Sequence, residues 1–177
     1  MKKHNIILLI TVLLPCVCFA EMDRFLEGVE DIPGIENIRN WDKSDWHHAA
    51  NHGHPEIQHL LGMKYEMGSG VRQDYKESAK WYLKAAKQNH FTAQYMLGDL
   101  YFSGKGVRQS YSQAMMWYLK AVEQGHTGAC ISIGNMYLNG YGVKKDIKAA
   151  KEWYGKACDR GYQKGCDKYR KLNEAGY

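Results

Sequence analysis

The sequence has 177 residues, of which 45% are hydrophobic, 12% aromatic and 24% charged. This length is enough for one ordinary domain with a sizeable core, and this composition excludes disorder of the whole chain. The net charge of +5 is unevenly distributed: residues 21–45 contain eight acidic and three basic residues, whereas the chain from residue 46 onward contains eleven acidic and nineteen basic residues. The two parts therefore carry net charges of −5 and +8.

The first twenty residues have the pattern of a secretory signal peptide. Two lysines precede the apolar run IILLITVLL (residues 6–14), and a short exit ends at Ala20. The run is too short to span a membrane comfortably, and no later segment approaches eighteen consecutive apolar residues. We therefore expect cleavage near Ala20 and a periplasmic or secreted bacterial protein. A lipid anchor on Cys16 is disfavoured, because Pro15 stands where lipoprotein processing requires a small residue.

The acidic segment, residues 21–45, has two interpretations. It can be one of two solvated surfaces of opposite sign, or an acidic leader that lies along the basic part and inhibits binding. Nucleic acid does not explain the basic part, because its lysines are spread around the predicted helices instead of forming a stripe.

From residue 46 onward the sequence repeats itself every 36 residues. Three related stretches begin at Gly70, Gly106 and Gly142: GVRQDYKESAKWYLKAAKQNH, GVRQSYSQAMMWYLKAVEQGH and GVKKDIKAAKEWYGKACDRGY. Within each unit the apolar residues have helical spacing in two blocks separated by glycines. A half repeat precedes the three units and a polar capping helix follows them, as the ends of stacked arrays require. We predict an all-α solenoid of antiparallel helix pairs over residues 46–177.

Each predicted first helix contains a leucine or isoleucine, then a glycine and, three residues later, a tyrosine. A glycine inside a helix costs about 1 kcal/mol relative to alanine, so its recurrence at one position requires a packing reason. We expect the partner helix to approach closely at these glycines. The three sets are Leu61, Gly62, Tyr65; Leu97, Gly98, Tyr101; and Ile133, Gly134, Tyr137.

Glycines also end each first helix. Gly68, Gly104 and Gly140 fit a left-handed C-terminal cap. Glycine pairs occur in phosphate-binding loops too, but here no predicted strand precedes them and no Lys-Ser or Lys-Thr follows. Joints between helices are therefore the better interpretation.

The second helix of each pair begins with a capping residue. Asp74 with Glu77, and Ser110 with Gln113, have the spacing of a capping box, and Asp146 caps the third helix. Each second helix also carries a Trp-Tyr pair, which could form a ligand platform, although its recurrence at a fixed position indicates core packing. These pairs are Trp81-Tyr82, Trp117-Tyr118 and Trp153-Tyr154.

The period of 36 residues, LGDLYFSGKGV (residues 97–107) and AMMWYLKAVEQGH (residues 114–126) resemble the SEL-one-like repeat (SLR) family, a relative of the tetratricopeptide repeat. The resemblance covers residues 49–165. It implies a right-handed superhelix whose members usually act as adaptors for other proteins and not as catalysts. It identifies no partner, and we expect no cofactor.

Three cysteines follow the predicted cleavage site. Cys158 and Cys166 lie eight positions apart across a turn at Gly161, and we expect a disulfide between them in an exported protein. Cys130 lacks this partner, because the matching position is Val122. A buried thiol and an intermolecular bridge are both open for Cys130.

The cysteine pair is also similar to the cysteine-rich secreted branch of the family, some of whose members are described as binding or slowly hydrolysing penicillin-like compounds. That branch carries the pair in most units, whereas this chain carries it once. No serine is followed by a lysine three residues later, and the motifs Gly-x-Ser-x-Gly and His-Glu-x-x-His are absent. We therefore expect a protein that is not an enzyme, with a cell-wall or β-lactam-directed activity as the alternative.

Histidines are concentrated between residues 47 and 59. His48 and His52 have the i, i+4 spacing of two metal ligands on a helix. His54, however, shares its repeat position with His90 and His126, which indicates a role at the start of a helix. The other histidines fit a hydrophilic cap, and we predict no metal site.

Residues that differ between units on one stripe of the first helices are the candidates for partner binding. They form trios with spacing i, i+4, i+7, and the resemblance implies that this stripe faces a concave groove. We expect a protein or peptide partner there, with envelope and cell-wall proteins among the candidates. Ile131 completes the third trio, but Ile131, Phe102 and Leu138 could equally fill space between units. The predicted binding residues are His59, Met63, Glu66, Tyr95, Asp99, Phe102, Asn135 and Leu138.

Overall fold

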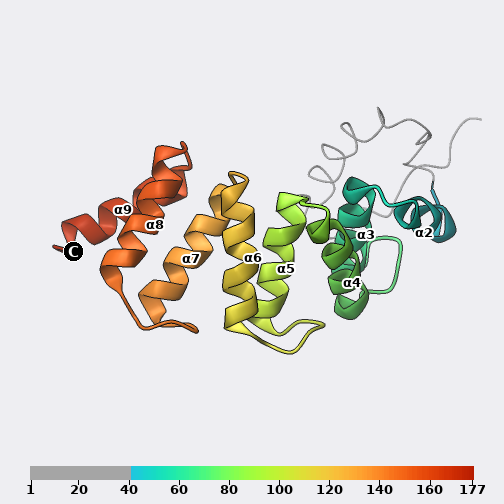
Figure 1. Ribbon diagram of the computed structural model, residues 1–177, viewed down its shortest axis with the longest axis horizontal. Helices are drawn as coiled ribbons and strands as arrows, with labels where there is room; N and C mark the ends of the chain where they lie inside the picture. The colour runs from blue at the N-terminus through green and yellow to red at the C-terminus, as the bar shows by residue number, and fades with distance from the viewer. Residues whose placement is uncertain (1–40) are drawn as a thin grey trace, which may run out of the picture. The chain divides into compact units, whose positions relative to one another are not determined.

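The computed structural model describes residues 41–177, which contain eight α-helices and, within this range, no β-strand. Each helix packs against the next one in the chain, so that α2 to α9 form a single row (Figure 1). This confirms the predicted all-α repeat fold. The predicted signal peptide and residues 21–40 lie outside the described residues. The helices are α2 (Lys43–Asn51), α3 (Pro55–Met67), α4 (Tyr75–Lys87), α5 (Phe91–Ser103), α6 (Tyr111–Glu123), α7 (Thr127–Asn139), α8 (Ile147–Asp159) and α9 (Gln163–Glu174).

Helix α2 begins before the boundary that we placed at residue 46. Asp42 caps it, because its side chain accepts the backbone N–H groups of Ser44 and Asp45 at 2.7 and 3.0 Å. The Asp45 carboxylate in turn accepts the Asp42 N–H at 3.0 Å, which completes a capping box. Residues 42–45, which we assigned to the acidic segment, thus start the compact unit of residues 42–177.

The two helices of each pair approach most closely where a tyrosine lies on a glycine. A Cβ atom built on this glycine would lie 2.5–2.6 Å from the tyrosine ring, which is closer than any side chain can come without a shift. The tyrosines are 0–1% exposed. The predicted close approach at the glycines and the predicted core role of these tyrosines are therefore confirmed. The pairs are Gly62–Tyr82, Gly98–Tyr118 and Gly134–Tyr154.

A short loop joins the helices of each pair and closes back onto the first helix. Gly68, Gly104 and Gly140 end α3, α5 and α7 with φ values of 73°, 73° and 77°, which confirms the predicted left-handed caps. The N-cap residue of each second helix then donates its backbone N–H to the carbonyl of a tyrosine in the first helix at 2.9 Å. Ser110, for example, donates to the Tyr101 carbonyl.

The predicted capping residues of the second helices all accept backbone N–H groups. Asp74 does so at 2.8 and 3.2 Å, Ser110 at 3.3 Å and Asp146 at 3.0 Å. The capping boxes that we predicted at Asp74 and Ser110 are both only half formed, because the backbone N–H of each residue donates instead to a tyrosine carbonyl of the first helix at 2.9 Å. The Glu77 carboxylate binds the Lys80 ammonium at 2.5 Å.

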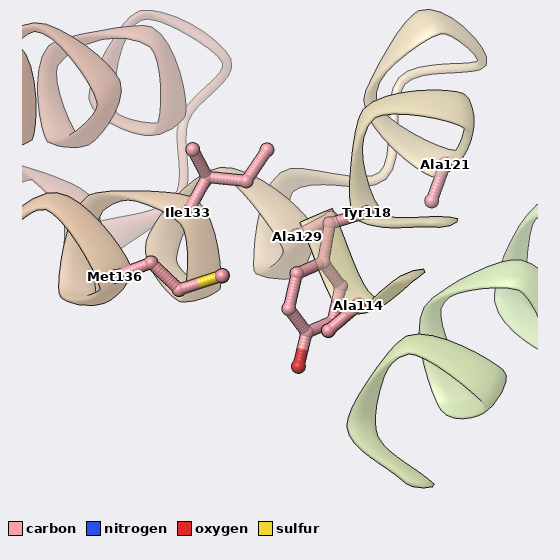
Figure 2. Close-up of a cluster of buried hydrophobic side chains, with 6 residues drawn as sticks. All are labelled: Ala114, Tyr118, Ala121, Ala129, Ile133 and Met136. Atoms are coloured by element: carbon pink, nitrogen blue, oxygen red, sulfur yellow. The ribbon is translucent and has the colours of Figure 1, made fainter. Parts of the chain in front are cut away.

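The hydrophobic core is shared between neighbouring repeats. One cluster combines three residues of α6 with three residues of α7, and alanines stand beside larger side chains in it (Figure 2). Since the two helices belong to consecutive repeats, neither repeat contains this core alone, and burial is gained only when repeats stack. The cluster consists of Ala114, Tyr118, Ala121, Ala129, Ile133 and Met136.

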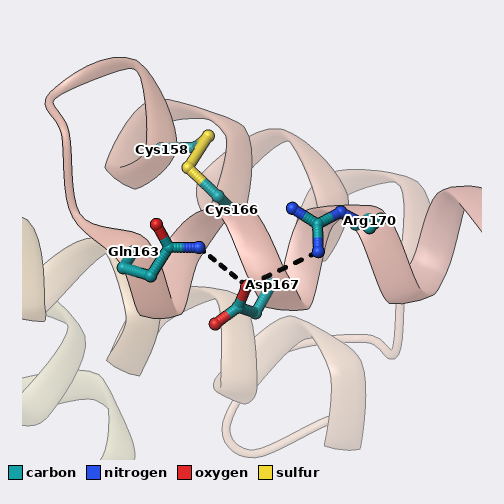
Figure 3. The surroundings of a disulfide bond; sticks show 5 residues. All are labelled: Cys158, Gln163, Cys166, Asp167 and Arg170. Atoms are coloured by element: carbon teal, nitrogen blue, oxygen red, sulfur yellow. Dashed lines mark hydrogen bonds and ion pairs between the residues drawn. A yellow bond between two sulfur atoms is a disulfide. The ribbon is translucent and has the colours of Figure 1, made fainter.

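The last two helices are joined covalently. Cys158 of α8 and Cys166 of α9 form the predicted disulfide, with an S–S distance of 2.00 Å and a Cα–Cα distance of 4.5 Å (Figure 3). Cys130 is a buried free thiol, which supports the first of the two alternatives for this residue. Among the described helices none is long and apolar enough to cross a membrane.

Candidate partner-binding face

The eight predicted binding residues lie on one stripe of α3, α5 and α7, which we call the first-helix face. Six of them are half-buried. His59 and Met63 are buried, with exposed fractions of 2% and 9%, so our expectation that they lie on an exposed face is wrong. The side chains that remain accessible on this face are those of Glu66, Tyr95, Asp99, Phe102, Asn135 and Leu138.

The polar residues of the first-helix face accept hydrogen bonds from the buried tyrosines of the second helices. The Tyr118 hydroxyl donates to Oδ1 of Asp99 at 2.6 Å, and the Tyr154 hydroxyl donates to Oδ1 of Asn135 at 2.8 Å. Asp99 and Asn135 occupy the same repeat position. A buried tyrosine hydroxyl needs a partner, which explains why an oxygen acceptor recurs at this position.

In the first repeat, a residue at a different position accepts the tyrosine hydroxyl. Met63 occupies the position of Asp99 and Asn135, and a thioether is only a weak acceptor. The Tyr82 hydroxyl donates instead to Oε2 of Glu66, which lies three residues further along α3, at 2.7 Å. Each of the three repeats therefore fixes one oxygen acceptor on the first-helix face.

Burial controls the protonation of these groups. It raises the pKa of Asp99 above its usual value, although hydrogen bonds from the Tyr118 and Tyr95 hydroxyls act in the opposite direction. Burial and the nearby Asp99 charge also raise the pKa of Tyr95 to about 12 and that of Tyr118 further. Both tyrosines are therefore neutral hydrogen-bond donors at neutral pH, and neither is tuned as a general base.

Histidine rings extend the first-helix face at the starts of α5 and α7. His90 and His126 cap these helices, because Nδ1 of each accepts the backbone N–H three residues later at 3.1 Å. This confirms the helix-start role that we predicted for their repeat position, although His54 makes no such side-chain bond. The His90 ring stacks on His59 at 4.6 Å, and the His126 ring stacks on Tyr95 at 4.3 Å.

One histidine of the stacked pair, His59, has a strongly lowered pKa. Burial, followed by the charge of His90, lowers the pKa of His59 to about 3. His59 is therefore neutral at physiological pH and belongs to the packing between α3 and α5 instead of the accessible surface.

Phe102 belongs to an aromatic cluster that we did not predict. Its ring centroid lies 5.3 Å from that of Tyr111 and 5.4 Å from that of Tyr141, and the two tyrosine centroids are 5.5 Å apart. Tyr141 lies in the loop after α7, at the repeat position of Ser69 and Lys105. The sequence did contain a signal for this cluster, because Tyr141 is an aromatic residue at a loop position that is polar in the other repeats.

A cleft that the sequence did not predict lies between α2 and the start of α4. Its volume is about 750 Å³. Nε2 of His47 and the Tyr65 hydroxyl are 2.6 Å apart at its wall. None of the eight predicted residues lines it; its lining residues are Lys43, His47, Tyr65, Arg72, Gln73, Asp74, Tyr75, Lys76, Glu77 and Gly106.

His48 of α2 and His52, which caps the C-terminal end of α2, lie side by side. The Nε2 atoms of His48 and His52 are 3.0 Å apart, within hydrogen-bonding distance of each other. Within residues 41–177 there is no cluster of three or more His, Cys, Asp or Glu side chains with a suitable arrangement.

The helix pairs coincide with a known family of repeats. The Sel1 repeat matches residues 55–90, 92–126 and 127–162, which correspond to α3–α4, α5–α6 and α7–α8. A comparison with curated proteins gave no match. Sel1 repeat proteins are in general scaffolds for protein–protein interaction.

Solved structures of Sel1 repeat proteins are similar to this chain. A protective antigen of uropathogenic Escherichia coli strains, which displays an SLR fold, is 32% identical over 90% of this chain, with a TM-score of 0.74. A Sel1 repeat protein from Oxalobacter formigenes is 28% identical over 84% of this chain, with a TM-score of 0.62. This chain spans 36% and 55% of the lengths of these two proteins.

A third similar structure carries the cysteine-rich type of repeat. It is the cysteine rich protein B of Helicobacter pylori, which is 25% identical over 72% of this chain and 97% of its own length, with a TM-score of 0.56. The three family matches cover more than half of the sequence and fall on the three observed helix pairs. The chain therefore belongs to the Sel1 repeat family.

Proposed function

We propose that this chain is an exported scaffold, not an enzyme, and that it binds a partner protein or peptide through the first-helix face. The observation that carries the proposal is the row of oxygen acceptors at Glu66, Asp99 and Asn135, each half-buried and each held by a tyrosine hydroxyl. Side chains that are fixed before binding lose little conformational entropy when a partner docks. Their chemistry differs between repeats, which suits recognition of a specific sequence.

The centre of the proposed site is α5. Tyr95, Asp99 and Phe102 place an aromatic hydroxyl, a carboxylate and a phenyl ring along one stripe of this helix. Tyr95 is braced by the His126 ring and Phe102 by two tyrosine rings. Braced aromatic residues beside a polar anchor are typical of interface hot spots.

Export is part of the proposal. It is supported by the signal-like pattern of residues 1–20 and by the Cys158–Cys166 disulfide, because stable disulfides are rare in reducing compartments. Mass spectrometry of the protein purified from its own cells tests it. A mature chain that begins at Glu21 and carries one disulfide is the expected result, and a full-length reduced chain recovered from the cytoplasm would contradict it.

A hydrolase that acts on β-lactams is the alternative. The groups with strongly raised pKa values, such as Tyr82 and Tyr118, are buried between helices and bonded to the acceptor row, which supports a structural role for them. Incubation of the mature protein with a chromogenic β-lactam separates the two functions. We expect no turnover; turnover that persists after Tyr95 and Asp99 are replaced would contradict the scaffold function.

Two substitutions borrowed from the third repeat test the proposed face. Asp99→Asn and Phe102→Leu introduce the residues that stand at positions 135 and 138, so the fold should tolerate both. Lys87→Gln on the exposed surface of α4 is the control. We expect a protein that co-purifies with the wild type and with the control to be reduced about tenfold by the double variant. Equal recovery with all three proteins would contradict a partner site on this face.

A further inference from the structure

We propose a second docking surface, which binds an acidic peptide segment of a partner protein that carries an aromatic or aliphatic side chain. This surface is the loop edge: the three loops that join the helices of each pair, with the first turns of α4, α6 and α8 (residues 68–77, 104–113 and 140–149). This second proposal depends on the proposed function in one respect, namely that the partner is a protein. The loop edge contains none of the residues of the first-helix face, and it adjoins that face where Phe102 contacts Tyr111 and Tyr141.

The loop edge is one continuous surface. Gly106 packs against the Tyr75 carbonyl and Gly142 packs against the Tyr111 side chain, each so closely that a Cβ atom on the glycine would overlap its neighbour. These glycines have φ values of 70° and 67°, which other residues rarely adopt. The second and third loops are therefore each seated on the start of the preceding repeat's second helix, which links the three loops along one edge.

The loop edge is strongly basic. Its three segments contain seven lysines and arginines but only three acidic residues. Asp74 and Asp146 use Oδ1 to cap α4 and α8, and Glu77 uses Oε1 to bind Lys80, so one oxygen of each acidic group is engaged within the protein. The basic side chains are all exposed, and they are Arg72, Lys76, Lys105, Arg108, Lys144, Lys145 and Lys148.

Aromatic rings lie between these charges. Tyr141 is 40% exposed although it stacks on Tyr111 and contacts Phe102, so the cluster leaves an accessible ring on the loop edge. One repeat earlier the position of Tyr141 is Lys105, whose ammonium lies 5.2 Å from the centre of the Tyr75 ring. A basic surface interrupted by rigid rings offers both ion pairs and an apolar anchor to a ligand.

The groups in the cleft favour a peptide over a uniform polyanion. At the α2 end of the loop edge, the 750 Å³ cleft places Arg72 and Lys76 beside Gln73, Asp74 and Glu77. Carboxylates there would repel the continuous charge of a nucleic acid or an acidic polysaccharide. A peptide, in contrast, can place its acidic side chains on the basic groups and its amide groups on the carboxylates and the glutamine.

Two matched triple variants of the full chain test the proposal. The edge variant carries Arg108→Gln, Lys144→Gln and Lys145→Gln, and the control variant carries Lys87→Gln, Lys164→Gln and Lys171→Gln, three exposed lysines outside the loop edge. Each of the two variants loses three positive charges. The probe is a library of fluorescent acidic peptides that each contain one tryptophan, compared with a library in which glutamine replaces every acidic residue.

We expect members of the acidic library to bind the wild type and the control, and to bind the edge variant at least about tenfold more weakly. Tyr141→Ser, which introduces the residue of the first repeat at this position, should weaken the same peptides about fivefold while the protein remains folded at the assay temperature. Asp99→Asn should leave them unaffected, which separates this surface from the first-helix face.

Four outcomes would overturn the proposal. Equal losses in the two triple variants would show that only overall charge matters, and equal binding of the glutamine library would show that acidity is irrelevant. Heparin or single-stranded DNA that binds the wild type more tightly than every peptide, and loses affinity in the edge variant, would show a polyanion site instead. Absence of any bound acidic peptide would also exclude the proposed ligand.

Discussion

The ring of Tyr118 occupies the space that a side chain on residue 98 would need. A Cβ atom on Gly98 would lie 2.6 Å from Cδ1 and Cε1 of this ring, and the other two repeats have the same arrangement. The hydroxyl of the same tyrosine bonds Asp99, the next residue of α5. One tyrosine thus sets the distance between two helices and also fixes a polar group of the first-helix face.

Gly98→Ala should destabilise the protein because the added methyl group forces α5 and α6 apart. Overpacking of this kind costs about 1–3 kcal/mol, and the better helix propensity of alanine returns about 1 kcal/mol of it at most. We expect a lower free energy of unfolding in urea denaturation. Gly155→Ala is the matched control, because a Cβ at this helical position would meet Tyr169 at an ordinary 3.4 Å. A loss in the control as large as that in Gly98→Ala would contradict the packing argument.

Asp99→Asn should remove a destabilising contribution that depends on pH. Because burial raises the pKa of Asp99 in the folded state, the ionised carboxylate disfavours folding at neutral pH, and this penalty vanishes as the pH falls below the unfolded value of 3.8. The amide of asparagine still accepts the tyrosine hydroxyl, as Asn135 does at the same repeat position. The variant should be at least as stable as the wild type at pH 7 and lose that advantage near pH 3. Marked destabilisation at pH 7 would be inconsistent with a buried, penalised carboxylate.

His59→Ile should reduce the acid sensitivity of the fold. Folding lowers the pKa of His59 from 6.5 to about 3, so between these pH values the unfolded chain binds more protons than the folded protein. The contribution of the buried, neutral His59 to stability is therefore complete above pH 6.5. That contribution is lost progressively as the pH falls from 6.5 towards 3. Isoleucine stands at this repeat position in α7, as Ile131, and does not titrate. The free energy of unfolding, measured from pH 7 to pH 4, should therefore fall less steeply than in the wild type.

The exposed Ser112 provides the comparison for this measurement. Ser112→Ala adds and removes no titratable group, so it should keep the wild-type dependence of stability on pH. A His59→Ile variant that is as acid-sensitive as the wild type would exclude His59 as a source of acid destabilisation.

Val122→Cys should create a second disulfide, with Cys130. Residues 122 and 130 lie one repeat before Cys158 and Cys166, and Cys130 is already a buried thiol. A bond that closes so short a loop should stabilise the protein by about 2–3 kcal/mol under oxidising conditions. Mass spectrometry of the unreduced protein and thermal unfolding with and without reductant measure the effect. Val122→Ala is the control, and two free thiols in the oxidised Val122→Cys protein would show that the two repeats are not equivalent here.

The features that the sequence predicted well depend on local chemistry. The helix ends at Gly68, Gly104 and Gly140 follow from the left-handed backbone that glycine allows, and the Cys158–Cys166 bond follows from a spacing of eight residues across one turn. Both can be deduced from a short stretch of sequence, although the disulfide joins the third repeat to α9.

The features that it predicted poorly depend on neighbouring repeats. His59 is variable between repeats and therefore resembled a surface residue, but the ring of His90 at the start of the next first helix covers it. Glu66 accepts a hydrogen bond from the Tyr82 hydroxyl only because Met63, at the usual acceptor position, has no oxygen. The cleft between α2 and α4 likewise depends on how the half repeat is placed against the first full repeat.

Site-specific photo-crosslinking in the producing cells tests the proposed scaffold function most directly. A photoreactive phenylalanine analogue is placed at Tyr95 on the first-helix face or at Lys87 on the exposed surface of α4. We expect one protein that crosslinks at position 95, does not crosslink at position 87, and is no longer crosslinked when Phe102→Leu is added. Crosslinks of equal yield at both positions, or none at position 95 in cells that contain the folded protein, would contradict the scaffold function.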